Sequence, residues 1–366
     1  MSKIGFLIGP GGTRDGLGEY IIKVGCSGNK PIIFANDLDG EIISALEYAS
    51  IVAFRVVRDG SEQYSVPDYS LSPKEAAIKH WRTISQYFPV SIMENRGRVW
   101  IFPINEPDKN RADWLGYFSY ELAIIANAQG YKIASLGFSA GEPEPDHWHT
   151  PGMQKYLRYC GANPNRAGVC LHEYSLSMDH LVDNGWMVGR FRFLHYACDQ
   201  LGMPRPTILL GEFGWTDRAT PSPETALQHI LQADSLYAPH RNILGAGLWY
   251  LGYYNNTTIA QQVQKLIAPI TEISKAQTCP GTPRTQYRRE YWVLPQEASL
   301  EETQRIVAEA YEKKVTMGWS FDDAGIGDLG DINAVLWGIP EAAKNTYRTW
   351  YATYYPSVKV SFRNLD

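Results

Sequence analysis

The chain has 366 residues, of which 44% are hydrophobic and 20% are charged. This composition is typical of a globular protein with a large core, and the length excludes a single small domain. The net charge of −5 predicts no nucleic-acid partner, because binding to a polyanion requires a broad basic surface.

The N-terminal segment is apolar but too short for the hydrophobic region of a signal peptide. No stretch of the sequence reaches the roughly 20 apolar residues of a membrane span. We therefore expect a soluble protein without a membrane partner, either cytoplasmic or released by lysis, for example by a phage. Five cysteines without CxxC spacing predict neither a disulfide scaffold nor a zinc site. The oligomeric state stays open.

Apolar runs alternate with longer amphipathic segments up to about residue 275, which predicts repeated βα units. Helix starts are marked by Ser72, Pro73 and Glu75, which form a capping-box sequence, and by Ser222 with Pro223. Eight such units favour a (β/α)8 TIM barrel over a doubly wound sheet, which usually has fewer strands and a glycine motif. The predicted strands are Ile4–Ile8, Pro31–Ala35, Ile51–Val57, Val99–Ile104, Lys132–Phe138, Gly168–Leu171, Thr207–Leu210 and Ile243–Tyr250.

A Pro/Gly-rich linker, residues 276–287, separates the barrel (1–275) from a small C-terminal α+β domain (288–366). The order of its elements is β-α-β-β-α-β, which is the order of ferredoxin-like domains. Because this segment has its own set of elements, we expect a chain ending near Lys275 to keep its activity. The predicted elements are strands Tyr291–Leu294, Val315–Phe321, Ala334–Ile339 and Val358–Phe362, and helices 299–313 and Glu341–Tyr354.

Two glutamates end predicted barrel strands, at the edge where barrel enzymes have their active sites. Glu106 follows Asn105 after the fourth strand, and Glu212 follows Gly211 after the seventh. Either carboxylate alone would be explained as well by a helix cap or a surface ion pair. Two of them, three strands apart, predict the acid and nucleophile that glycoside hydrolysis needs.

The order and spacing of these motifs resemble clan A of the glycoside hydrolases, in their retaining, cellulase-like form. The resemblance covers residues 1 to about 275 and assigns no single family. It implies that Glu106 is the acid/base, that Glu212 is the nucleophile, and that Asn105 binds the sugar 2-hydroxyl. It implies no cofactor.

Further motifs of the resemblance lie on other strands. The sequence His172-Glu173-Tyr174 is similar to a His-x-Tyr motif whose Tyr holds the nucleophile, and Trp249 ends the eighth strand, where a sugar platform is expected. Either Arg55 or Arg58 could be the arginine near the nucleophile, and Arg55 is favoured. The first strand, which ends in glycines, offers no matching motif.

The segment from Glu142 to His149 follows the fifth strand and concentrates carboxylates, imidazoles and an indole. A solvated loop is the simplest interpretation, and a substrate-lining loop with Trp148 as a second sugar platform is the next. His147 and His149 could also bind a metal, but the barrel metallohydrolases carry their His-x-His on the first strand, so we expect no metal.

The leading hypothesis is therefore a retaining glycoside hydrolase that cleaves β-linked oligo- or polysaccharides by double displacement. One alternative is a carbohydrate-binding barrel without catalysis. Another is a phage or cell-wall-lytic glycosidase acting on peptidoglycan. Because an acid catalyst must hold a proton, the hypothesis also predicts a raised pKa for Glu106, whereas Glu212 stays ionised.

Overall fold

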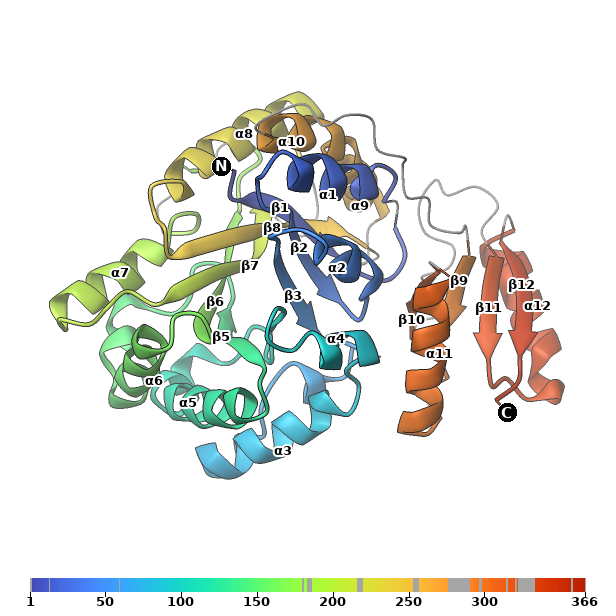
Figure 1. The fold of residues 1–366 in the computed structure, drawn as a ribbon, viewed down its shortest axis with the longest axis horizontal. Coiled ribbons are helices and arrows are strands. Elements are labelled where there is room, and N and C mark those ends of the chain that lie inside the picture. The colour runs from blue at the N-terminus through green and yellow to red at the C-terminus, as the bar shows by residue number, and fades with distance from the viewer. Residues whose placement is uncertain are drawn as a thin grey trace.

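The protein is described by a computed structural model that covers residues 2–12, 14–58, 60–179, 181–182, 186–215, 220–252, 257–275, 290–295, 298–313, 315–319, 321, 333–356 and 358–365. Eight parallel strands close into a barrel in chain order, and helices surround it (Figure 1). This confirms the predicted (β/α)8 barrel. The predicted linker lies outside the described residues.

The barrel elements alternate as expected from the sequence. The strands are β1 (Ile4–Ile8), β2 (Ile32–Asn36), β3 (Ile51–Arg55), β4 (Trp100–Ile101), β5 (Lys132–Phe138), β6 (Ala167–Ser175), β7 (Thr207–Trp215) and β8 (Ile243–Leu251). The helices are α1 (Leu17–Cys26), α2 (Gly40–Ala45), α3 (Pro73–Ser85), α4 (Val90–Glu94), α5 (Ala112–Ala128), α6 (Pro151–Ala162), α7 (Phe191–Gln200), α8 (Pro223–Tyr237), α9 (Thr257–Lys265) and α10 (Ile267–Ser274). Short 3-10 helices are η1 (Glu62–Tyr64), η2 (Lys109–Arg111) and η3 (Pro145–His149).

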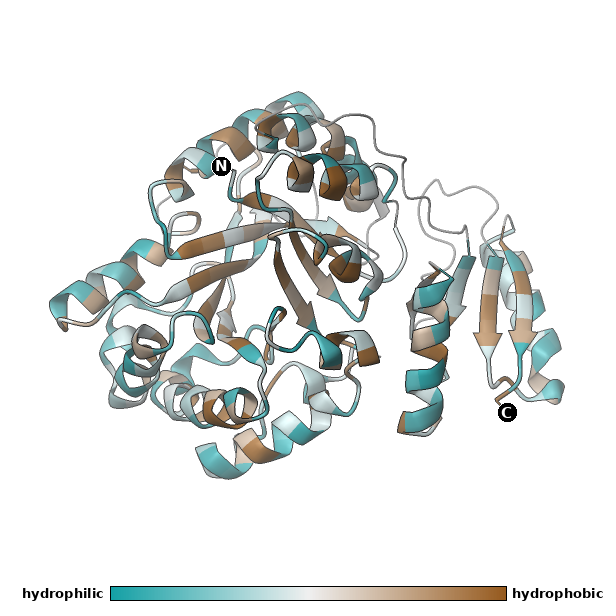
Figure 2. Ribbon diagram, viewed as in Figure 1, coloured by the Kyte–Doolittle hydropathy of each residue, from teal (hydrophilic) through white to brown (hydrophobic). Residues whose placement is uncertain are grey.

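The barrel strands are apolar and buried, whereas the surrounding helices are polar on their outer faces (Figure 2). Both faces of a parallel barrel are covered, one by the helices and one by the side chains that fill the interior, so its strands lack polar alternation. The capping box of Ser72 and Glu75 forms at α3, and the Ser222 side chain caps α8. No described helix is long and apolar enough to cross a bilayer.

Three barrel strands differ in length from the prediction by four or five residues. β4 ends early because Pro103 has no N–H to donate to a neighbouring strand. β6 and β7 instead continue to Ser175 and Trp215, so that His172 and Glu212 lie within paired strands. The register shifts between Leu171 and His172, and beyond this shift His172 pairs with Glu212.

The C-terminal domain contains the predicted elements but not the predicted topology. Its four strands are all parallel, in the order β10-β9-β11-β12, whereas a ferredoxin-like sheet is antiparallel. The ferredoxin-like prediction is therefore wrong: α11 connects β9 to the adjacent parallel strand β10, and α12 connects β11 to the adjacent parallel strand β12, as crossover connections of parallel strands do. The elements are β9 (Glu290–Val293), α11 (Leu300–Glu312), β10 (Thr316–Gly318), β11 (Asn333–Trp337), α12 (Glu341–Tyr354) and β12 (Lys359–Arg363).

The C-terminal domain touches the barrel. Helix α11 lies on the barrel side of the small sheet, and α12 lies on the far side (Figure 1). The amide of Gln304 on α11 is 4.0 Å from the sulfur of Met93 on α4, and the rings of Trp319 and Tyr87 pack edge to face at 6.1 Å. The two domains therefore share a packed boundary.

Candidate active site

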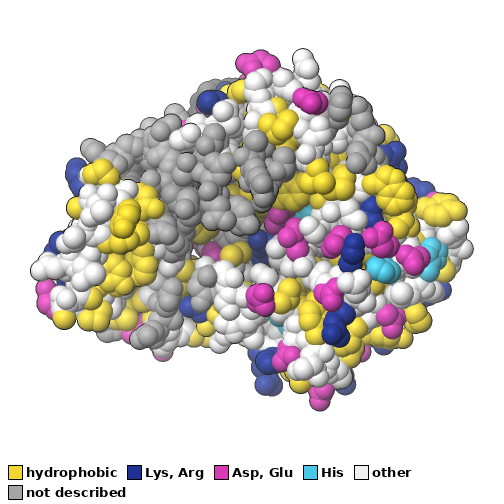
Figure 3. Space-filling model, turned by 180° about the vertical axis from the view of Figure 1, so that it is seen from behind, with side chains coloured by type: hydrophobic (Ala, Val, Ile, Leu, Met, Phe, Trp, Pro, Cys, Tyr) yellow, Lys and Arg dark blue, Asp and Glu magenta, His cyan; other side chains and the backbone are white. Residues whose placement is uncertain are grey.

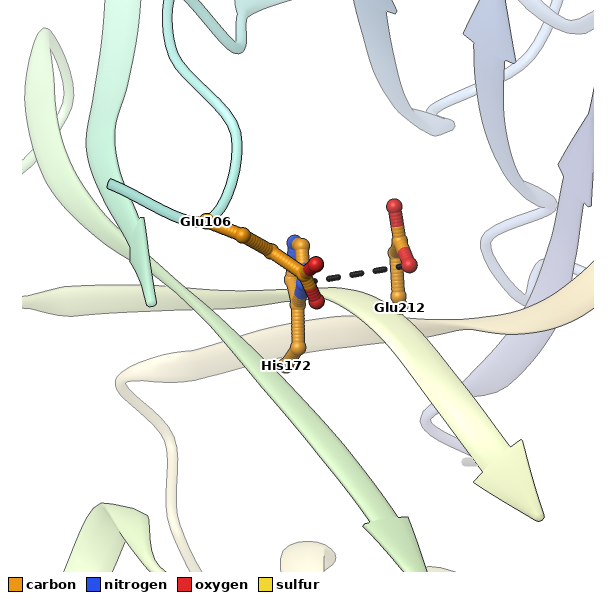
Figure 4. A group of neighbouring side chains, drawn as sticks. All are labelled: Glu106, His172 and Glu212. Atoms are coloured by element: carbon orange, nitrogen blue, oxygen red, sulfur yellow. Dashed lines mark hydrogen bonds and ion pairs between the residues drawn. The ribbon is translucent and has the colours of Figure 1, made fainter. Parts of the chain in front are cut away.

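The two candidate glutamates lie together at the C-terminal edge of the barrel. Carboxylate oxygens of Glu106 and Glu212 and a ring nitrogen of His172 are all within 4.8 Å of one another. Figure 4 shows Glu106 extending from the loop after β4 toward Glu212 on β7, with His172 of β6 beside them. The Glu106 side chain is 41% exposed, whereas that of Glu212 is 9% exposed. One carboxylate is thus accessible from the barrel mouth and the other is held deeper.

Glu106 has an unusual backbone conformation. Its φ of +46° lies in the left-handed region, which L-residues rarely occupy, and its N–H donates to the carbonyl of Gly137 at 2.8 Å. Gly137 belongs to the end of β5, where the pairing register with β6 shifts between Leu136 and Phe138. Strain of this kind persists only where surrounding contacts hold it, and it often marks functional sites.

Glu212 is held by donors at both of its oxygens. Nη1 of Arg55 lies 3.0 Å from Oε1, and the hydroxyl of Tyr174 donates to Oε2. Arg55 also donates to the side-chain oxygen of Asn105. Of the two arginines considered from the sequence, the structure brings Arg55 to this carboxylate, whereas Arg58 points toward the C-terminal domain. Glu212 is therefore fixed in orientation and kept next to a positive charge.

His172 is buried between the two carboxylates. Its Nδ1 lies 3.2 Å from Oε1 of Glu106 and 3.7 Å from Oε2 of Glu212. Burial alone would lower the pKa of His172, but the charge of Glu212 and hydrogen bonds with Cys170 and Glu106 outweigh it and raise this pKa to about 10. The imidazole therefore carries a proton near neutral pH.

The hydrogen bond from His172 lowers the pKa of Glu106, and Ser139 contributes in the same direction. This contradicts the expected raised pKa of Glu106. The sequence-based argument considered repulsion from Glu212 and burial, but the protonated imidazole beside Glu106 is the stronger influence. In the free protein the proton thus lies on His172, and Glu106 is ionised.

Aromatic rings line the site beside Glu212. Trp249, near the end of β8, is partly exposed and packs edge to face on Tyr174 with ring centroids 6.0 Å apart. It also stacks on Tyr250 at 5.4 Å. Contacts with Tyr250 and Tyr174 therefore hold the ring of Trp249 in place, and Tyr174 is the residue that donates to Glu212.

Trp148 is not part of this surface. It is 1% exposed and packs edge to face on Phe138 within the core. A sugar platform must offer an open ring face, so the expectation of Trp148 as a substrate contact is wrong. Its position in η3, directly before α6, turns the indole inward, and one sequence could not reveal this direction.

The segment around Trp148 is joined to the loops after β4 and β6 by charged side chains. Lys109 lies 2.9 Å from Glu144 and 3.5 Å from Glu142, and Arg190 lies 3.9 Å from Glu144. Figure 3 shows the face of the molecule that is turned away in Figure 1, on which acidic side chains lie with basic and histidine side chains among them. Glu142 and Glu144, which the sequence placed in a solvated or substrate-lining loop, therefore form ion pairs with residues of neighbouring loops.

Among the described residues, one group has the spacing of a metal site: Glu106, His172 and Glu212. Both oxygens of Glu212 already accept hydrogen bonds from Arg55 and Tyr174, and a protonated imidazole has no free lone pair for a metal. The donor set therefore fits proton transfer better than metal binding. His147 and His149 are not members of this group.

Two residues of the site were not singled out from the sequence. Ser139 follows β5 and contributes a hydrogen bond to Glu106. Asp37 follows β2, is buried, and accepts hydrogen bonds from the N–H groups of Val57 and Arg58. Ser139 directly follows a predicted strand and Asp37 lies two residues beyond one, so a search for polar residues near every strand end would have found them.

No protein-family model matches the chain, and no curated protein matches it. Among solved structures, it is similar to an endo-β-1,4-glucanase from Xanthomonas axonopodis pv. citri, with a TM-score of 0.47, 12% identity, and coverage of 75% of this chain and 100% of the other. It is also similar to a Bifidobacterium dentium β-glucuronidase complexed with coumarin-3-O-glucuronide, with a TM-score of 0.45, 12% identity, and coverage of 75% and 47%. A third is a xyloglucan-specific endo-β-1,4-glucanase from a metagenomic library, solved with cellotriose, with a TM-score of 0.44, 9% identity, and coverage of 74% and 96%. Likeness at these values does not assign an activity, so the function depends on the geometry of the site.

Proposed function

We propose that the protein is a retaining glycoside hydrolase that cleaves β-linked oligo- or polysaccharides, with Glu212 as nucleophile and Glu106 as acid/base. The observation that supports this most is the closeness of the two carboxylates, whose oxygens lie within 4.8 Å of each other. Retaining enzymes have a separation of about 5 Å, whereas inverting enzymes leave about 6.5–9.5 Å for a water molecule.

In the first step, an oxygen of Glu212 bonds to the anomeric carbon while the bond from that carbon to the glycosidic oxygen breaks. Arg55 and Tyr174 hold the carboxylate in a fixed direction, which reduces the entropy that the attack would otherwise lose. The departing oxygen takes a proton from Glu106, and the product is a glycosyl ester of Glu212.

His172 supplies the proton that Glu106 lacks in the free protein. The charge of Glu212 is one cause of the raised pKa of His172. As Glu212 forms its bond to carbon it loses that charge, so the imidazole holds its proton less tightly. The proton can then pass over 3.2 Å to Glu106 and on to the leaving oxygen.

In the second step, Glu106 is a carboxylate again and accepts a proton from water, and this proton returns to His172 as Glu212 regains its charge. The water oxygen bonds to the anomeric carbon, the ester bond to Glu212 breaks, and the sugar keeps its original configuration. Asn105 is positioned by Arg55 beside Glu212, where it can bind the 2-hydroxyl of the sugar. Trp249 is partly exposed beside this pair, where it can stack on a sugar ring.

A glycan-binding barrel without turnover is the second candidate. The observation that favours it is the lowered pKa of Glu106, because a free acid catalyst is ordinarily protonated.

Hydrolysis of β-glucans, mannans, xylans, chitin and peptidoglycan, with NMR of the first product formed, decides between the candidates. We expect cleavage of at least one polymer with retention of the β configuration. Inversion would contradict Glu212 as nucleophile, and binding without cleavage would support the second candidate.

A further inference from the structure

The C-terminal domain contacts Arg58, a residue in the loop that follows barrel strand β3. The guanidinium carbon of Arg58 lies 3.6 Å from the ring centroid of Tyr87, in the barrel, and 4.0 Å from that of Trp319, which follows β10. Trp319 is buried at this boundary. Because the planes of these two rings are 81° apart, the planar guanidinium can stack on one of them while its charge is attracted to both.

The backbone around Arg58 is also tied to β2. Oδ2 of Asp37 accepts from the N–H of Arg58 at 2.7 Å, and Oδ1 accepts from Val57 at 2.9 Å. The N–H of Asp37 in turn donates to the carbonyl of Arg55 at 2.9 Å. Asp37 and Arg58 both have left-handed φ values, +58° and +52°, which such a set of contacts must maintain. The segment from Arg55 to Arg58 is therefore fixed as one turn.

The loop that begins at this turn reaches the candidate active site at two points. At its start, the Arg55 side chain contacts both Asn105 and Glu212. Farther along, the carbonyl of Ser65 accepts the N–H of Asn105 at 2.7 Å, and the neighbouring ring of Tyr64 lies 5.7 Å from the Arg58 guanidinium. A movement of Arg58 would therefore displace both Arg55, which contacts Glu212, and Asn105, which directly precedes Glu106.

We propose that the C-terminal domain positions residues of the active site. Trp319 holds Arg58 in place, and Arg58 fixes the loop between β3 and α3, which in turn fixes the positions of Arg55 and Asn105. The catalytic consequence rests on the proposed hydrolase function. This inference reverses the expectation that the barrel alone would be sufficient. A contact that only adds stability would leave the geometry around Glu212 unchanged.

The test uses the full chain with Trp319→Ala, Arg58→Ala and Arg58→Lys. Tyr354→Ala is the matched control, because Tyr354 is 64% exposed on α12 and packs on Trp350 within the same domain. We expect Trp319→Ala and Arg58→Ala to lower kcat at least tenfold while KM changes less than threefold. Arg58→Lys keeps the charge but loses the planar stacking, so it should fall between them and the wild type. Tyr354→Ala should match the wild type.

A second measurement does not depend on turnover. The imidazole resonance of His172, assigned in labelled protein by its loss in His172→Asn, reports on the charges of Glu106 and Glu212. We expect it to shift in Trp319→Ala and Arg58→Ala but not in Tyr354→Ala. Unchanged kcat and unchanged resonance in folded Arg58→Ala would overturn the proposal.

The two readouts separate this inference from the proposed function. If the wild type cleaves no glycan, the hydrolase proposal fails, and the His172 resonance alone decides whether the domain positions the site. If Trp319→Ala does not fold, the Arg58 variants decide, because they leave every residue of the C-terminal domain unchanged.

Discussion

Replacing His172 by Asn tests whether the proton that Glu106 needs as an acid lies on His172 in the free protein. The amide nitrogen of Asn lies close to the position of Nδ1, so a donor to Glu106 is retained while the titrating group is lost. In the wild type the pKa of His172 is raised to about 10 from an ordinary 6.5. This difference corresponds to about 5 kcal/mol in favour of the protonated imidazole in the folded protein.

The sign of the effect on stability follows from linkage. The folded pKa of His172 is above the unfolded value, so its contribution is complete below pH 6.5 and is lost as the pH rises to about 10. The wild-type free energy of unfolding should therefore fall across this range by up to about 5 kcal/mol, and His172→Asn should lack this fall. Urea unfolding at several pH values measures it.

The same replacement should shift the alkaline limb of the pH profile, that is, the pH at which kcat/KM falls on its alkaline side, measured on a substrate with a poor leaving group. In the wild type the shared proton is kept until His172 titrates. In His172→Asn the proton must reside on Glu106, without the protonated neighbour, so the limb should move toward acid by several pH units. His149→Asn, a partly exposed histidine on the same face, is the control. Equal alkaline limbs and equal stability profiles in wild type and His172→Asn would refute the proton arrangement.

Three further predictions concern single side chains. Glu106→Gln should slow glycosides with poor leaving groups by about a hundredfold or more and activated aryl glycosides far less, as paired rate measurements would show; equal slowing would contradict the role of acid. Burial lowers the pKa of His80 to about 4, so its stabilising contribution, on the order of 3 kcal/mol, is present above pH 6.5 and lost as the pH falls to about 4. His80→Gln, which can still donate to the Pro103 carbonyl, should show a smaller loss on acid titration, and an identical acid unfolding curve would exclude this origin. Trp148→Ala should reduce the free energy of unfolding by about 3–5 kcal/mol, measured in urea, without changing glycan affinity in the folded protein; a selective loss of affinity would restore Trp148 as a sugar contact.

The barrel and the positions of both glutamates could be predicted because they depend on local sequence patterns. Apolar runs of strand length with polar ends are visible in one chain, and the closed barrel sets where those ends meet. The pairing of His172 with Glu212 could not be predicted, because it depends on a register shift between two strands. The position of the proton was missed for the same reason, since it needs the distance from His172 to Glu106.

In the C-terminal domain the helices could be predicted from the sequence, but the directions of the strands could not. Its helices begin and end close to the predicted residues, and Ser299 forms a capping box with Glu302 at the start of α11. Strand direction, however, is set by how a connection crosses the sheet, and the order of elements is the same for parallel and antiparallel arrangements. The contact between Arg58 and Trp319 joins residues far apart in sequence, and no local pattern announces it.

The most direct measurement of the central claim is the fate of Glu212. In Glu212→Ala no covalent intermediate can form, so turnover should fall by several orders of magnitude for natural and activated substrates alike. Added azide should restore part of the activity on an activated glycoside and give a glycosyl azide of inverted configuration, because azide attacks from the face that Glu212 occupied. A Glu212→Ala variant that keeps wild-type turnover, or a rescued product that retains the configuration, would contradict the account.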